Sequence, residues 1–584
     1  MRPTVRHAER RQVPPVDGVT RKPETRRDSL GRLRTLSGEL GGVTFHRPFA
    51  FWIGVTAVIA GVLLHLPMYL HGRHNGYRLV GMPMDWSMTL GMVVIIAGMA
   101  ASLYGLFPKG GGDGKRGGRS LRVAALDDAT LSFAHVALLL SMAVAVMIDI
   151  MKPTSLAFVV PGMTAEYGLK SPLNPAGTIP AAYLALAGIT GTVIGSMVWG
   201  WLGDKIGRRA SILYAGISFI ATSICGAMPD FYWNVAMCFL MGLGVGGMLP
   251  IAYTLLAETI PARHRGWLSV LIGADIAGAY ILTSWIAAEL VPVYSWRILW
   301  LIGLPTGVLF LLLNRWIPES PRFLLACGRA DEAGAVMRRY GAVPVHEPGP
   351  GPQLPVPMEG RWQALVAPRF IGTTLVVSSL GIGCGLVLFG FNLWIPTNLR
   401  KLGFREADLI LRNSALIGLP LTFVVAWLYS SWGSKKTVMA LSAITSLALA
   451  GFVLAGDSIV HNRALLYALL VAPIGGINAV VAVLSVYSSE IYPTPVRAKG
   501  AGLCAGACKA GGVLIIALVC FGMAPPSIAV VALIGAVPMA LAVLALAWFG
   551  VETRHRSLEE IGTSLAKVGR DSLAPVFPAR STER

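Results

Sequence analysis

Long apolar stretches recur along the whole chain and alternate with polar segments. A helix needs about 20 mostly apolar residues to cross the hydrocarbon core of a membrane, which is about 30 Å thick. The pattern therefore predicts an all-α polytopic membrane protein. Fourteen stretches can be placed, so we expect about 14 transmembrane helices, centred on residues 48–70, 85–107, 131–151, 179–201, 210–227, 232–255, 267–289, 295–314, 370–396, 407–430, 437–455, 464–488, 501–522 and 527–549.

The composition agrees with this interpretation. Of the 584 residues, 54% are hydrophobic and only 14% are charged. A water-soluble globule cannot cover so much apolar surface, so the solvent must be lipid. The seven cysteines show no metal-binding spacing, and Cys504 and Cys508 lie in a Gly/Ala-rich stretch where cysteine is typically a small apolar filler. We expect no disulfide and no metal site.

A net charge of +19 is also typical of nucleic-acid-binding proteins. Most of the cations, however, gather in the N-terminal tail and in loops that share one side of the membrane if the helices alternate. By the positive-inside rule that side is the cytoplasm. We therefore expect the inner (cytoplasmic) membrane of a cell, both termini in the cytoplasm and no nucleic-acid partner. Exceptions occur in two loops, at Arg73, Arg78, Arg400, Lys401 and Arg405.

Polar segments divide the chain into seven parts. Residues 1–47 precede the first apolar run and are mostly polar, which predicts a disordered basic cytoplasmic tail rather than a cleaved signal peptide. The other boundaries predict an extra transmembrane helix pair at 48–107, a cytoplasmic linker at 108–127, a six-helix half at 128–316, a cytoplasmic central loop at 317–368, a second six-helix half at 369–550 and a cytoplasmic C-terminal tail at 551–584.

An internal repeat supports the division into two halves. The first half contains AETIPARHRG and the second contains SEIYPTPVRAKG. Glu258 and Arg265 therefore recur as Glu490 and Arg497, each 232 positions later. Pseudo-symmetric halves with a site between them near the bilayer midplane are the general architecture of membrane carriers.

The loop after the second helix of the first half reads GWLGDKIGRRASI. It resembles the signature of the major facilitator superfamily, G-x-L-x-D-x-x-G-R-[RK], and its place between two helices also fits. The resemblance implies the major facilitator fold, with two six-helix pseudo-symmetric halves, here preceded by two extra N-terminal transmembrane helices. The matching residues are Gly200, Leu202, Asp204, Gly207, Arg208 and Arg209.

Two further segments resemble signatures of sugar porters and organic-ion transporters. They are PESPRFL at 318–324 and ETRHRSLEEI at 552–561. The repeated glutamate-to-arginine elements are shared with the same relatives. Together the resemblance covers residues 125–562.

Asp204 lies at a helix end, where its carboxylate can pair with Arg208 and accept hydrogen bonds from the amides of a helix N-terminus. Such contacts would latch one half to the other in one state of a transport cycle. The second half reads YSSWGSKKT, with Ser430 in place of the acid, so we expect an asymmetric latch. The residues expected to act in gating are Gly200, Asp204, Gly207, Arg208, Arg209, Glu258, Arg265, Glu490 and Arg497.

Ionisable groups inside a membrane are costly unless they are paired or hydrated, so they are candidates for function. Asp149 and Lys152 are three residues apart in the first helix of the first half and are expected to be able to pair. This helix resembles that of aromatic-acid/proton symporters, where Asp149 matches the first acid of D-x-x-D and Lys152 replaces the second. Asp275 and Lys509 are the other two such charges.

Lys509 favours an anionic solute. In organic-anion transporters a basic residue precedes a similar Gly-Gly pair in this helix, whereas organic-cation transporters have an acid there. One hypothesis is that Lys509 and Lys152 bind a substrate carboxylate while Asp149 or Asp275 carries a coupling proton. The alternative is that the four groups form ion pairs that only hold helices together. Cys238 stands where many proton-coupled relatives have arginine, which argues against the usual coupling arrangement.

Other polar and aromatic side chains could line a cavity around these charges. Aromatic residues at helical spacing are also typical of helix packing, and Trp394 suits an interfacial aromatic belt equally well. The candidate substrate-binding residues in this group are Asn392, Trp394, Tyr253, Tyr280 and Asn478.

These observations predict a secondary active transporter of a small organic solute. They favour an organic acid anion carried by proton-coupled symport with alternating access. A sugar porter, a drug efflux antiporter and a non-transporting membrane sensor with a transporter fold are alternatives. The chain lacks the G-x-x-x-x-G-K-[ST] phosphate loop and shows no catalytic set, so we expect neither ATP-driven transport nor an enzyme. We expect no cofactor, a proton or ion gradient as driving force, the solute and membrane lipid as partners, and a monomeric transport unit.

Overall fold

The computed structural model describes residues 46–107, 126–343, 362–521 and 527–561, apart from short gaps, together with four two-residue strands. The gaps are 171–173, 175, 274, 369, 393–394, 396–397, 400–401, 405–406 and 559. Most of the predicted N-terminal tail, most of the predicted linker at 108–127 and residues 562–584 lie outside the described residues.

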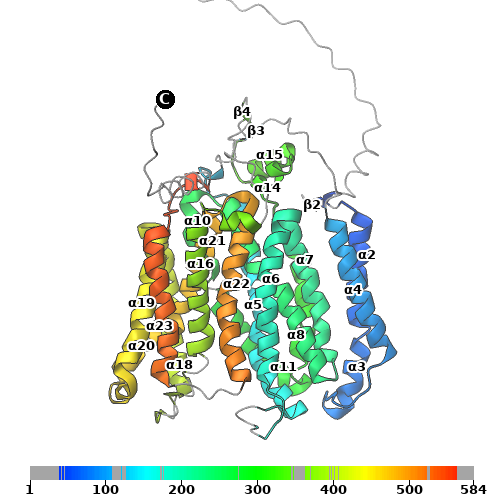
Figure 1. The fold of residues 1–584 in the computed structure, drawn as a ribbon. Coiled ribbons are helices and arrows are strands. Elements are labelled where there is room, and N and C mark those ends of the chain that lie inside the picture. The colour runs from blue at the N-terminus through cyan, green and yellow to red at the C-terminus, as the bar shows by residue number, and fades with distance from the viewer. Residues whose placement is uncertain are drawn as a thin grey trace, which may run out of the picture.

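Helices make up nearly all of the described chain, as the apolar pattern predicts, and they run roughly side by side (Figure 1). Within the described ranges, 11 helices are long and apolar enough to cross a membrane. The first half consists of α5 (Phe133–Tyr167), α6 (Ala182–Ile206), α7 (Arg208–Ala221), η3 (Thr222–Ala227), α8 (Phe231–Val245), α9 (Met248–Thr259), α10 (Ala262–Gly273), α11 (Asp275–Tyr294), α12 (Ile298–Leu301) and α13 (Gly303–Leu313).

The second half lies beside it. It consists of α16 (Ile371–Gly385), η5 (Leu386–Phe391), α18 (Ala407–Trp432), α19 (Ser434–Ala455), α20 (Arg463–Leu470), η7 (Val471–Gly476), α21 (Ile477–Ile491), α22 (Arg497–Cys520) and α23 (Ile528–Phe549). Two short 3-10 helices, η6 (Gly456–His461) and η8 (Thr494–Val496), precede α20 and α22.

Three predicted stretches are not among the 11 spans but are helical. The stretch at 267–289 falls on α10 and α11, the one at 295–314 on α12 and α13, and the one at 407–430 on α18. The count of about 14 therefore stays a prediction. The first core helix differs most, because α5 continues through Pro153 and Pro161 to Tyr167. Each proline removes one backbone hydrogen bond, whereas ending the helix inside lipid would leave several groups without partners.

One end of the bundle carries most of the short polar elements (Figure 1). The segment predicted as a central loop forms α14 (Pro321–Ala326), α15 (Ala330–Arg339) and η4 (Trp362–Val366) there. We call this end the basic end because four buried arginines lie there, namely Arg208, Arg265, Arg322 and Arg497. Strand β3 (Ser120–Leu121) pairs with β4 (His346–Glu347), and β1 (Glu39–Leu40) pairs with β2 (Val43–Thr44).

The extra helix pair consists of α2 (Pro48–Leu63) and α4 (Trp86–Leu106), joined through α3 (Leu66–His71) and η1 (Gly72–Asn75). Glycines let the two backbones approach closely, since a Cβ on Gly98 would lie 2.7 Å from the carbonyl oxygen of Gly54. The pair lies beyond α7, on the side of the first half that faces away from the second half (Figure 1). It is therefore an addition to one half rather than a bridge between halves.

Two hydrogen bonds fix the loop side of this pair to the first half. The Tyr69 hydroxyl donates to the carbonyl of Tyr294 at 2.9 Å. The Leu79 amide donates to the carboxylate of Glu166, also at 2.9 Å. Glu166 in turn accepts from Arg297 at 2.7 Å, so the loop between α3 and α4 is joined to a buried ion pair of the core.

The two halves meet most closely along α6 and α22, which lie side by side (Figure 1). A Cβ on Gly200 would lie 2.7 Å from the carbonyl oxygen of Ala498, and one on Gly502 would overlap the carbonyl oxygen of Ser196. Small residues at this crossing bring the halves into backbone contact. Any relative movement of the halves must change this contact.

Candidate functional site

Asp204 joins the two halves at the basic end. Its carboxylate pairs with Arg208 at 3.2 Å and with Lys499 of the other half at 3.0 Å. It also accepts hydrogen bonds from the amides of Ala498 and Lys499, which lie at the start of α22. The predicted pairing of Asp204 with Arg208 and with a helix N-terminus is confirmed. Lys499 is an additional partner, placed two residues after the repeated arginine.

The repeated glutamates and arginines pair crosswise. Glu258 of the first half binds Arg497 of the second half at 2.6 Å. Arg265 of the first half binds Glu490 of the second half at 3.2 Å. All four side chains are buried. Because each repeat supplies one acid and one base to the other, the charges at this interface are balanced, and separating the halves would leave buried charges without partners.

Asp127 and Arg322 extend this network to the elements next to the helices of the first half. Asp127, just before α5, binds Arg265 at 3.1 Å and Arg322 of α14 at 2.8 Å. Arg208 also binds Glu258 at 3.1 Å. Arg322 belongs to the PESPRFL segment, so that resemblance was a signal for it. Asp127 carried no such signal, since it stands in a polar stretch between helices.

Two glutamates close the signature loops of the two halves in the same way. Glu319 accepts hydrogen bonds from the amides of Arg208, at 2.8 Å, and Arg209 at the start of α7. Glu552 accepts from the amide of Ser434, at 2.7 Å, at the start of α19. Burial raises the pKa of Glu319, while hydrogen bonds from backbone amides lower it. Both glutamates lie in segments noted for their resemblance, PESPRFL and ETRHRSLEEI, yet their role emerges only from the fold.

A glycine with positive φ stands beside each of these carboxylates. Gly207 has a φ of 103° and Gly433 a φ of 109°, a region that other residues rarely adopt. A Cβ on either glycine would overlap the neighbouring carboxylate, of Glu319 or of Glu552. The signature glycines are therefore needed both for the turn and for the space that the capping glutamate occupies. Arg209 completes the turn by donating to the carbonyl of Asn314 at 2.8 Å.

The latch is asymmetric in the second half, as the presence of Ser430 predicts. When the two signature loops are aligned, Ser430 corresponds to Asp204. In the glutamate-to-arginine repeat, Gly266 and Trp267 correspond to Ala498 and Lys499. A cavity of about 20 Å³ lies between Ser430, Gly266 and Trp267. The second half thus lacks both the carboxylate and the ammonium of the pair that Asp204 and Lys499 form.

Lys509 bridges the halves deeper in the bundle. Its ammonium donates to the Ser196 hydroxyl at 3.1 Å and to the carbonyl of Gly246 at 3.3 Å, both in the first half. The residue remains half-buried. Asp149 of α5 is buried and close enough for its charge to interact with that of Lys509. Within the described part of the chain, one of its carboxylate oxygens has no hydrogen-bond partner. Among the candidate charges whose side chains the structure describes, Lys509 and Asp149 are the two that the fold brings together.

The expected pairing of Asp149 with Lys152 is wrong. The Lys152 ammonium has no hydrogen-bond partner among the described residues, and it lies against Gly303 and the hydroxyl of Ser223, within the first half. It borders a cavity of about 20 Å³ between α5, α11 and the α12–α13 segment. Lys152 thus packs against η3 and α13 of its own half, whereas Asp149 interacts with Lys509 of the other half. Lys152 is therefore not placed to share a solute with Lys509.

The other candidate residues are spread along the bundle. Tyr253 is buried, with its hydroxyl near Gly273, where α10 meets α21 of the other half. Asn478 is half-buried on α21. Just after η5, a buried oxygen of Asn392 has no hydrogen-bond partner among the residues that the structure describes. The side chains of Asp275, Tyr280 and Trp394 lie outside the described residues.

A family comparison decides the class of the protein. The family described as "Sugar (and other) transporter" matches residues 163–565, well over half of the chain. The chain belongs to this family. It is therefore a multi-pass transmembrane transporter of the major facilitator superfamily and not an enzyme, as the signature loop predicted.

Curated relatives of this transporter are similar over most of their length. The niacin transporter NiaP of Acinetobacter baylyi is 26% identical over 452 residues, which are 75% of this chain and 99% of the relative. The putative metabolite transport protein YdjK of Escherichia coli is 29% identical over 391 residues, 64% of this chain and 83% of the relative. The synaptic vesicle 2-related protein of Xenopus laevis is 28% identical over 71% of this chain and 78% of its own.

Solved structures of a xylose transporter share the fold. The proton:xylose symporter XylE bound to 6-bromo-6-deoxy-D-glucose matches with a TM-score of 0.59 at 19% identity, over 75% of this transporter and 100% of that chain. The partially occluded inward open form of XylE from Escherichia coli matches with a TM-score of 0.52 at 18% identity. This match covers 72% of this transporter and 99% of that chain. The predicted major facilitator fold is confirmed.

Proposed function

We propose that this transporter carries a small organic acid anion by proton-coupled symport with alternating access. The observation that carries the proposal is the position of Lys509, a half-buried ammonium that reaches across the interface of the halves. A cation at this depth is costly unless an anion neutralises it. Its hydrogen-bond partners, a hydroxyl and a carbonyl, are neutral, and the carboxylate near it is that of Asp149. Once Asp149 is protonated, a carboxylate solute is the partner that would compensate the charge of Lys509.

The relatives are compatible with a carboxylate. The niacin transporter matches this chain over nearly the whole of its own length. Niacin is a small aromatic carboxylic acid. The uncharged lining near Lys509 includes Ser196 and a backbone carbonyl. These groups orient the ammonium without competing with an anion for its charge.

Asp149 is the candidate carrier of the coupling proton. Its carboxylate is buried, and one of its oxygens has no hydrogen-bond partner in the ranges that the structure describes. Its charge interacts with that of Lys509. When the solute anion binds Lys509, the attraction between Lys509 and Asp149 is shared with the solute, which favours a proton on Asp149. Solute and proton would then bind together, which is what symport requires.

The crossed ion pairs suggest how access alternates. In this structure Glu258–Arg497 and Arg265–Glu490 hold the basic end closed. We propose that this end faces the cytoplasm of an inner membrane, in keeping with the positive-inside rule. The solute would reach the cytoplasm when both pairs separate together and the halves rock about the α6–α22 crossing.

Uptake into proteoliposomes tests the proposal. With an imposed pH gradient, labelled aromatic and aliphatic monocarboxylates should accumulate when the outside is acidic. Lys509→Met should weaken solute affinity about tenfold or more, since a hydrogen bond to a charged group contributes about 1.5–3 kcal/mol. Lys152→Met is the matched control, since it removes a buried lysine that does not share the Lys509 site.

A sugar is the second candidate, favoured by the family description and by the likeness to XylE. Neutral sugars have no charge for Lys509 to balance. If pentoses or hexoses are transported, and Lys509→Met leaves their affinity within about twofold, the organic-acid proposal is wrong. Equal loss of affinity in the Lys509→Met and Lys152→Met variants would also contradict it, because the lysines would then act only through stability.

A further inference from the structure

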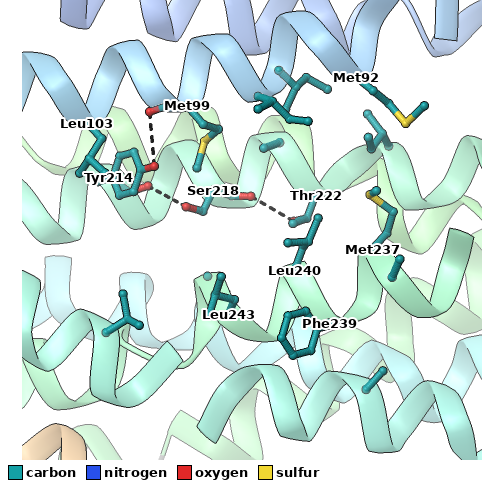
Figure 2. A pocket seen from close by; sticks show the side chains of 18 of the residues that line it. Met92, Met99, Leu103, Tyr214, Ser218, Thr222, Met237, Phe239, Leu240 and Leu243 are labelled. Carbon is teal, nitrogen blue, oxygen red and sulfur yellow. Dashed lines mark hydrogen bonds between the residues drawn. The ribbon is translucent and has the colours of Figure 1, made fainter. Parts of the chain in front are cut away.

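A large cleft separates the extra helix α4 from the first half. Its volume is about 1010 Å³, and all of its lining residues belong to α4, α6, α7, η3 or α8 (Figure 2). It therefore lies apart from Lys509 and from the interface of the halves. Its volume is at the upper limit of about 1,000 Å³ for pockets that hold drug-sized ligands.

The wall of the cleft is largely apolar, and three of its hydroxyl groups bond to the protein itself. The Tyr214 hydroxyl donates to the carbonyl of Met99 at 3.4 Å, and Ser218 donates to the carbonyl of Tyr214 at 3.1 Å (Figure 2). Thr222 donates to the carbonyl of Ser218, also at 3.1 Å. The remaining lining includes Met92, Leu103, Phe239 and Leu240. What fits this wall is hydrocarbon.

The cleft is open to the bilayer and follows its normal. Val93 and Ile96 line it and are 59% and 69% exposed. Its lining on α4 runs from Thr89 to Leu103, which is about 21 Å at 1.5 Å per residue. That length is more than one leaflet of a hydrocarbon core about 30 Å thick and less than two. Acyl chains that enter from one leaflet therefore fit within this length.

A cation stands at the basic end of the cleft. Lys205 follows the cleft-lining residues of α6, is exposed, and has its ammonium 5.1 Å from the ring centre of Trp201 and 5.6 Å from that of Phe107. Trp201 itself lines the cleft. An ammonium held over aromatic rings at a membrane interface is placed to bind a phosphate group.

We propose that this cleft binds one anionic phospholipid, with its acyl chains between α4 and α8 and its headgroup phosphate at Lys205. The extra helix pair is fixed to the core by Tyr69 and Leu79 at the opposite end and by Tyr214 at one point along α4. The lipid fills the space that these contacts leave. It thereby joins the extra pair to the transport unit as part of the folded protein.

Lipid binding can be measured on the full chain by native mass spectrometry. Delipidated protein is titrated with phosphatidylglycerol or with phosphatidylcholine of the same chains. One phosphatidylglycerol should be retained per protein, in preference to phosphatidylcholine. Lys205→Gln should weaken phosphatidylglycerol binding about fivefold, the effect of one cation near an anionic headgroup. Lys436→Gln is the matched control, an exposed lysine at the start of α19 in the other half.

A second variant fills the cleft itself. Ala236 is an exposed lining residue of α8, so Ala236→Trp should remove binding of both lipids. Leu541→Trp, at an exposed position of α23 away from the cleft, should leave binding unchanged. Equal binding of the two lipids to the unaltered protein, or retention undiminished by Ala236→Trp, would overturn the proposal. The readout is lipid retention, so it is independent of which solute the transporter carries.

Discussion

Gly207 shows how a single position of the signature loop combines two demands. Its φ of 103° disfavours any side chain, and the space beside its Cα is taken by the carboxylate that caps α7. The sequence pattern places the glycine but does not say what fills the space. Only the fold brings Glu319, 112 residues later in the chain, to that spot.

Gly207→Ala should therefore destabilise the protein more than a positive φ alone requires. Gly328 also has a positive φ, of 76°, but a Cβ there would meet nothing within 4 Å. We expect Gly328→Ala to cost about 1–2 kcal/mol and Gly207→Ala about 1 kcal/mol more, because the glutamate cap is displaced. Thermal unfolding in detergent measures both, and similar losses would show that the carboxylate moves aside freely.

Local chemistry decided which site residues could be predicted. Asp204 and Arg208 are four residues apart, on either side of the turn at Gly207, so their pairing is a local contact that the signature loop predicts. Asp149 and Lys152 have a similar spacing but do not pair. Lys152 lies against Gly303 of α13, whereas Asp149 interacts with Lys509 of α22. The residues a few positions before and after a side chain do not determine which other helices pack against it. Lys499 was missed for the same reason, since its partner lies in the other half.

At the scale of elements, the glutamate-to-arginine segments hold the basic end together. Glu490→Gln should weaken the contact of α21 with Arg265 of α10 and populate a form with this end open, since breaking a buried pair costs about 3–5 kcal/mol. Spin labels at Lys205 and Lys436, exposed in opposite halves, should report longer distances. Glu289→Gln, at an exposed position on α11, should not change them.

The second half offers the opposite change. Ser430→Asp would put a carboxylate beside Gly266 and Trp267, where Asp204 meets its own partners in the other half. A carboxylate there would face Arg263 of α10, which lines the same cavity, and this attraction should favour the closed form by about 0.2–1 kcal/mol and slow transport. Ser431→Asp, one residue further along α18, serves as the control. Faster transport by the Ser430→Asp variant would mean that closure of this end does not limit the cycle.

Apolar periodicity was sufficient to predict the helices but not all of their ends. The first core helix was expected at 131–151, and it continues to Tyr167 through two prolines. In water a proline commonly ends a helix, whereas inside a membrane a broken helix would leave backbone groups without partners. The end of α5 is therefore decided by the surroundings rather than by its own residues.

For the whole molecule, the transport unit and the extra helix pair are separable in principle. The niacin transporter matches over 99% of its own length but only 75% of this chain. Deleting residues 1–107 should therefore retain solute transport and lower thermal stability, because α7 and α8 lose the cover of α4. Proteoliposome uptake and detergent melting measure the two effects. A well-folded truncated protein without transport would show that the pair takes part in the cycle.

The crosswise contacts also bear on how such a protein could arise. Glu258 pairs with Arg497, and Glu490 pairs with Arg265. The charges of each segment are therefore neutralised by those of the other copy of the repeat. Two identical six-helix chains related by a twofold axis would form both contacts from a single segment. A homodimeric ancestor would thus have been electrically balanced before its gene was duplicated and fused, and the loss of the acid at Ser430 would be a later divergence.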